Sequence, residues 1–188
     1  MTSTPDQRRA RMTAVCGWLI LLVAAAALLL PEVAASSGAL VVGELLLLAG
    51  ALEVVAAAGR QRARVPSTLA GVATLIAGGL FIARDETRFL PNITVIIFWL
   101  LLRVAALTLA TIEGGRSGVR RWTGIAAATD LALAAILISG LTLASIIVAL
   151  FGTTSELVAT FSWILALSFM ATGAMLLQIA ACEREGEP

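Results

Sequence analysis

Four ionisable side chains lie well inside long apolar segments of this sequence: Glu44, Glu53, Arg103 and Asp130. At the centre of a membrane-spanning helix, such a charge costs about 2.5–3.5 kcal/mol on insertion scales. Each group is therefore expected to face protein or water and to have a partner. Three acids and one base leave at least one acid without a fixed cation. These four residues are thus the candidates for proton-responsive chemistry.

Spacing and depth decide which of the four can meet. Glu44 and Glu53 are nine residues apart, and nine steps of about 100° bring a helix round to its opposite face. They are not expected to form a paired-carboxylate site. At about 1.5 Å per residue from the arginine-rich helix ends, Arg103 lies roughly 15 Å deep and Asp130 roughly 13 Å. On the same scale Glu53 lies near ~10 Å and Glu44 near ~24 Å, so Arg103 is level with Asp130 and within reach of Glu53.

Three interpretations of these groups follow. In the first, Arg103 pairs with Asp130 or Glu53 and fixes the helix register, while Glu44 is protonated and hydrogen-bonded to a neighbour. In the second, Glu44, Glu53 and Asp130 respond to proton concentration, as a sensor or along a proton path. In the third, they coordinate a substrate or an ion. The residues alone leave all three open.

Residue types that the sequence lacks exclude several functions. There is no His, no Lys and no Tyr, so Ser-His-Asp and Cys-His catalytic sites are ruled out. Cys16 and Cys182 are far apart in sequence, which argues against a zinc site, and we expect no disulfide in a reducing compartment. No Gly-rich phosphate loop or nucleotide fingerprint is present. We therefore predict a protein that is not an enzyme and has no metal or cofactor.

Composition points to lipid as the surrounding solvent. Of 188 residues, 60% are hydrophobic and 13% charged, whereas soluble domains carry about a quarter charged residues. A soluble fold would expose large apolar patches. The net charge of +1 gives no basic field for nucleic acid. The expected partner is the lipid bilayer, together with a second copy or another membrane protein.

Six stretches are long enough to span a bilayer, which needs about 20 apolar residues. They are 12–30, 34–58, 66–83, 90–112, 122–138 and 157–181. The predicted fold is an all-α integral membrane domain over 12–181, between tails 1–11 and 182–188. Within the link 139–156, the apolar stretch 141–150 is too short to span. We expect it to be an interfacial segment, with an overlong, tilted fifth helix as the alternative.

Arginine positions predict the orientation. Three arginines lie in the N-terminal tail, three between the second and third spans, three between the fourth and fifth, and one in the C-terminal tail: Arg8, Arg9, Arg11, Arg60, Arg62, Arg64, Arg116, Arg120, Arg121 and Arg184. The opposite side has only Arg84 and Arg88. The positive-inside rule therefore places both termini in the cytoplasm.

Small residues and a weak internal periodicity indicate how the helices pack. Ala70, Thr74 and Gly78 in the third span, and Gly124 and Ala128 in the fifth, are spaced by four and favour close helix contact, within the bundle or between copies. Three similar phrases also open alternate spans, which predicts three hairpin repeats. These phrases are Gly17-Trp18, Gly71-Val72 and Gly124-Ile125.

The chain resembles the HdeD family of small bacterial inner-membrane proteins, which are linked to acid resistance. The resemblance covers residues 12–181 and rests on length, six spans, arginine-rich turns and local phrases. These phrases are Pro31 at the end of the first helix, Gly43 and Gly50 in the second, and Trp99-Leu-Leu-Leu-Arg103 in the fourth. Val104 stands where family members often have glycine.

The resemblance implies a role in acid or envelope stress at the bacterial inner membrane. Arg103 is the only residue to which it gives a role. We therefore expect a non-enzymatic stress-response protein. One rival is a small transporter or channel subunit, which needs a polar cavity that joins Glu44 to Arg103. A second rival is a scaffold for a larger membrane complex.

Overall fold

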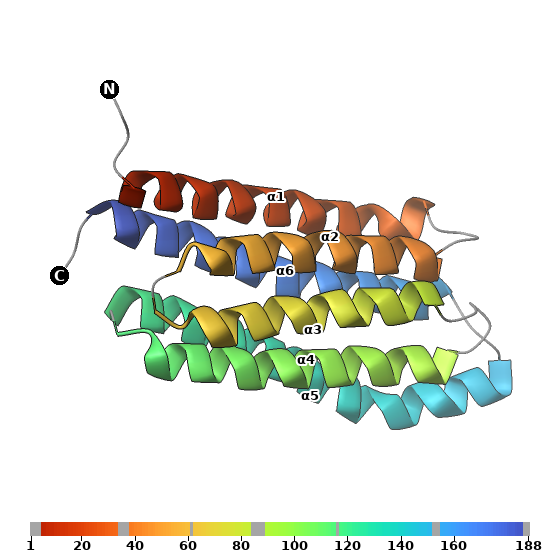
Figure 1. Ribbon diagram of the computed structural model, residues 1–188. Helices are drawn as coiled ribbons and strands as arrows, with labels where there is room; N and C mark the ends of the chain where they lie inside the picture. The colour runs from red at the N-terminus through yellow and green to blue at the C-terminus, as the bar shows by residue number, and fades with distance from the viewer. Residues whose placement is uncertain are drawn as a thin grey trace.

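The protein is a bundle of six long helices in the computed structural model (Figure 1). The structure describes residues 5–33, 38–60, 62–83, 89–115, 117–151 and 155–185. The helices are α1 (Pro5–Val33), α2 (Gly38–Ala58), α3 (Arg64–Ala83), α4 (Phe89–Glu113), α5 (Ser117–Phe151) and α6 (Ser155–Glu185).

Each of the six helices is long and apolar enough to cross a membrane. The bundle surface fits this use, since its exposed side chains include Trp18, Leu22 and Phe98, each more than 60% exposed. A surface of this kind is stable in lipid and costly in water. The prediction of an all-helical membrane protein with six spans is thus confirmed.

The fifth helix is longer than the predicted span 122–138. It continues without a break through Gly140 and the stretch 141–150 to Phe151, over 35 residues. Leu, Ile and Ala dominate this stretch and favour helix, and the single Gly140 costs only about 1 kcal/mol relative to alanine. The stretch 141–150 is therefore a continuation of α5 and not a helix of its own, and its interfacial position stays a prediction.

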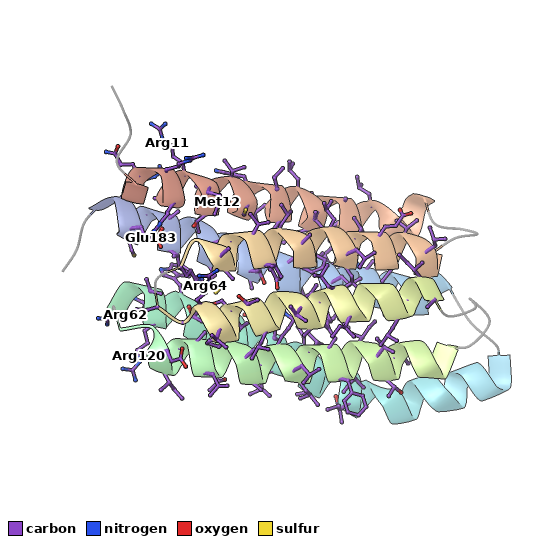
Figure 2. All side chains as sticks on the ribbon, viewed as in Figure 1. Arg11, Met12, Arg62, Arg64, Arg120 and Glu183 are labelled. Atoms are coloured by element: carbon purple, nitrogen blue, oxygen red, sulfur yellow. The ribbon has the colours of Figure 1, made fainter. Side chains whose placement is uncertain are left out.

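The start of α1 and the end of α6 lie at the same end of the bundle as the end of α2, the start of α3, the end of α4 and the start of α5 (Figure 1). Arginines gather there, and Figure 2 shows Arg11, Arg62, Arg64 and Arg120 at this end. Arg116, and the two arginines expected on the opposite side, Arg84 and Arg88, lie outside the described residues.

The helices form a ring in which each contacts its neighbours in sequence and α6 returns to α1. Three pairs pack most closely: α1 with α6, α2 with α3, and α4 with α5. Glycines allow the first two approaches. A Cβ atom on Gly17 would lie 3.1 Å from the Gly173 carbonyl oxygen, and one on Gly43 would lie 3.0 Å from that of Gly78. These are close small-residue contacts of the kind expected between membrane helices.

The predicted packing residues have different surroundings. Ala70, Thr74 and Gly78 are all buried, on the face of α3 that meets α2 and α4. In α5, by contrast, a Cβ on Gly124 would meet only the Thr111 methyl group at 3.7 Å, and Ala128 is exposed. Ala128 is therefore not buried between helices in the part of the chain that the structure describes.

Two adjacent glycines of α3 provide a matched test of this packing. A Cβ on Gly78 would lie 2.8 Å from the Gly43 carbonyl oxygen and from the Leu47 amide nitrogen, whereas one on Gly79 would meet nothing within 4 Å. We expect Gly78→Ala to destabilise the protein by about 1–3 kcal/mol through overpacking. Gly79→Ala should be neutral or stabilising by up to about 1 kcal/mol, from helix propensity. Thermal unfolding in detergent measures both, and equal effects would contradict the close α2–α3 contact.

Candidate functional site

A cluster of charged side chains centred on Arg103 of α4 lies in the interior of the bundle. Arg103 is 1% exposed, and its Nη1 donates hydrogen bonds to Glu53 Oε1 at 2.5 Å and Oε2 at 2.7 Å. Its Nε donates to Asp130 Oδ2 at 3.0 Å. Both carboxylates are buried, Glu53 at 6% exposed and Asp130 at 1%. Arg103 thus pairs with both acids that the depth estimate placed within its reach.

Hydroxyl groups of α6 complete the Asp130 side of the cluster. Ser168 Oγ donates to Asp130 Oδ1 at 2.6 Å, and Arg103 Nη2 donates to Thr172 Oγ1 at 2.7 Å. Ser168 and Thr172 are four residues apart and so lie on one face of the helix. Thr172 also donates to the Ser168 carbonyl oxygen at 2.9 Å. Both hydroxyls therefore bond to the cluster.

On the other side, Thr74 of α3 joins three members of the cluster. Its hydroxyl accepts hydrogen bonds from Arg103 Nη1 and from Trp99 Nε1, both at 3.0 Å. Its own proton has two acceptors within reach, the Ala70 carbonyl oxygen at 3.0 Å and Glu53 Oε2 at 3.3 Å. Thr74 is therefore both a packing residue, as predicted from its spacing, and a hydrogen-bonding centre.

An aromatic side chain covers the guanidinium. The Arg103 Cζ atom lies 5.4 Å from the centroid of the Trp99 ring, a cation–π distance. Trp99 meets Phe169 edge-on, with ring centroids 6.0 Å apart. Trp99 and Arg103 are four residues apart on α4 and so share a face. The guanidinium is thus enclosed by side chains of five helices, α2 to α6.

The third acid, Glu44, is not part of this cluster. It lies on the exposed surface of α2, as expected from the nine residues that separate it from Glu53. The cluster therefore contains two carboxyl groups and one guanidinium. Its formal charge is −1 when both acids are ionised and zero when one of them carries a proton.

A second arginine, Arg60, is buried at the arginine-rich end of the bundle. The chain leaves α2 through bonds from the Gly59 and Arg60 amides to the carbonyls of Ala56 and Ala57, and Ala63 then takes a positive φ of 54°. Arg60 is 7% exposed, and its Nη1 donates to Ser67 Oγ at 2.5 Å.

Half of the Arg60 guanidinium has no hydrogen bond. Among the described residues, its Nε and Nη2 atoms are buried without a partner. Burial lowers the pKa of Arg60 to about 10, even though the negative charges of Glu183 and Glu53 act to raise it. The side chain therefore remains charged at neutral pH, in a site that stabilises its charge less well than water does.

Arg60 and the charged cluster line the same small cavity. Its volume is about 20 Å³. Glu53, Arg60, Ser67, Arg103 and Thr172 supply its polar wall, and Leu107, Met175 and Leu176 are among its apolar residues. Glu44 does not line it, so the cavity does not join Glu44 to Arg103 as the transporter hypothesis requires.

Sequence reasoning did not single out Arg60 or Thr172. Arg60 is one of the loop arginines that predict the orientation, and its position two residues after the end of the second span gives no sign that it is buried. Thr172 is hard to single out because a hydroxyl in a membrane helix usually bonds to its own backbone. The signal that the sequence does offer is the spacing of four residues between Ser168 and Thr172, which places both hydroxyls on one face of a helix.

Within the part of the chain that the structure describes, no group of His, Cys, Asp or Glu side chains could hold a metal ion. Comparison with protein-family models, curated protein sequences and solved structures finds no match to this chain. The site must therefore be interpreted from its own geometry.

Proposed function

We propose that this chain is a non-enzymatic, multi-pass protein of the bacterial inner membrane that acts in acid or envelope stress, as in the HdeD family it resembles. The observation that carries the proposal is the buried group of Glu53, Arg103 and Asp130. Two acids share one base there, so the charge of the bundle interior depends on how many protons they hold.

Protonation of this cluster acts on several helices at once. Glu53 lies on α2, Arg103 on α4 and Asp130 on α5, and hydroxyls of α3 and α6 bond to them. A proton on either acid removes an ion pair from Arg103. If both acids are protonated, a buried cation is left without a counter-ion, which is costly. The cluster is thus a means by which acid can change helix packing.

The same proposal includes the topology. Both termini and the arginine-rich turns are assigned to the cytoplasm by the positive-inside rule, which puts Arg60 and its cavity on the cytoplasmic side. We also propose three hairpin repeats. Each hairpin would consist of α1 and α2, α3 and α4, or α5 and α6. The three closest helix pairs, α2 with α3, α4 with α5, and α6 with α1, each join one hairpin to the next, which supports a threefold repeat.

Survival at low pH tests the proposal. Cells that express Glu53→Gln or Asp130→Asn at the wild-type level should survive acid challenge less well than wild type, because an amide keeps the shape but not the titratable charge. Glu44→Gln, which removes an exposed carboxyl group from the same helix as Glu53, is the control and should behave as wild type. Wild-type survival of both cluster variants would remove the proton-responsive role.

A second candidate is a proton-linked transporter: Glu53 and Arg103 border a cavity, although this cavity does not reach Glu44 as the hypothesis requires. Proton flux into liposomes that contain the purified protein distinguishes the two functions. Flux that Glu53→Gln abolishes would support transport. An acid-survival effect without flux would support the stress-response role.

A further inference from the structure

We propose that the cavity beside Arg60 is a binding site for a small monovalent anion of about halide size. Within the described chain, this pocket has a polar side chain more than nine-tenths buried, Arg60, with two nitrogen atoms that lack any hydrogen-bond acceptor. The inference rests on Arg60 and its surroundings and does not depend on the proposed stress-response role.

The N–H groups of Arg60 that lack a partner require a ligand that accepts hydrogen bonds. Arg60 Nε and Nη2 carry only N–H donors, and a guanidinium has no acceptor at all. The acceptors in the wall already receive bonds: Ser67 Oγ from Arg60, and Glu53 and Thr172 from Arg103. The two N–H groups of Arg60 that lack a partner therefore require an acceptor, and an anion supplies one together with a counter-charge.

Charge points the same way. Arg103 is bonded to two carboxylates, and their cluster carries a formal charge of −1 when both are ionised, whereas Arg60 donates its hydrogen bond to the neutral hydroxyl of Ser67. The negative charges of Glu183 of α6 and Glu53 of α2 stabilise the Arg60 cation through space, but burial destabilises it by more. A bound anion would place a counter-charge directly against the two unpartnered N–H groups.

Volume limits the size of the anion. The cavity volume of about 20 Å³ exceeds the roughly 10–15 Å³ that one water molecule needs. It suits a single atomic ion, and it is small for a tetrahedral phosphate. The apolar residues Ala57, Leu107 and Met175 in its wall also favour a weakly hydrated halide.

Halide titration of the full-length protein in non-ionic detergent tests the site. Thermal unfolding is measured as sodium bromide replaces sodium gluconate at constant ionic strength. Wild type should show a saturable rise in Tm, because a ligand that binds only the folded state stabilises it. Arg60→Gln should weaken the apparent affinity by about ten- to a hundredfold, the loss expected for hydrogen bonds to a charged group.

Arg64→Gln is the matched control, because Arg64 is a nearby arginine whose side chain is exposed. This variant should keep the wild-type response. A wild-type Tm that is the same in bromide and gluconate, or an equal response in all three proteins, would show that the cavity holds only water. If Arg60→Gln does not fold, anomalous scattering from bromide in wild-type crystals decides. A peak beside Arg60 supports the site, and its absence at saturating bromide overturns it.

Discussion

Replacing Arg103 by methionine is expected to destabilise the protein by about 3–5 kcal/mol, the cost of removing one partner from a buried ion pair. Methionine has a similar length but neither charge nor donors. Glu53 and Asp130 would then be buried without the cation that bonds to both of them. Denaturant unfolding in mixed micelles measures the loss, and Arg64→Met, at an exposed arginine, should stay within about 0.5 kcal/mol of wild type.

A triple variant separates lost charge balance from lost packing. Adding Glu53→Leu and Asp130→Leu to Arg103→Met replaces the whole charged group by apolar side chains. Substitutions of this kind are often neutral, because the desolvation cost disappears with the charges. We expect the triple variant to regain most of the stability lost in the single one. A triple variant no more stable than Arg103→Met would show that the loss comes from packing around the guanidinium.

Much of the helical bundle could be predicted from the sequence, because few backbone structures can cross a lipid bilayer. A helix that crosses the bilayer must be about 20 residues long and apolar, so six spans could be counted from composition. The fixed rise per residue placed Arg103 level with Asp130, and the helical period put Glu44 on the face opposite Glu53. These inferences need no knowledge of which helices are neighbours.

What the sequence could not provide was the neighbour relation itself. Ser168 and Thr172 meet the cluster because α6 packs on α5, and Thr74 meets it because α3 packs on both α2 and α4. A hydroxyl in a membrane helix usually bonds to its own backbone, and nothing local marks one that also meets an arginine from another helix. Arg60 was obscured in a similar way, because loop arginines carry a strong topological signal that hides an individual buried side chain.

The second large effect is expected at Thr74. Thr74→Val keeps the shape of the side chain but removes the oxygen that accepts from Trp99 Nε1 and Arg103 Nη1. Arg103 Nη1 still has Glu53, whereas the buried Trp99 N–H loses the partner that the structure gives it. An unsatisfied buried donor costs about 1–3 kcal/mol, and more when charged groups are involved. We therefore expect a loss of about 2–3 kcal/mol, measured by denaturant unfolding.

Thr111→Val is the matched control for this prediction. Thr111 is half-buried on α4 and donates to the Leu107 carbonyl oxygen at 2.8 Å, the same i−4 bond that Thr74 makes to Ala70. Because that bond is common to both, the difference between the two variants isolates the contacts with Trp99, Arg103 and Glu53. Thr111→Val should change stability by less than about 1 kcal/mol. Equal losses in the two variants would mean that Thr74 contributes only its local helix bond, and that Glu53, Asp130 and Thr172 hold Arg103 without it.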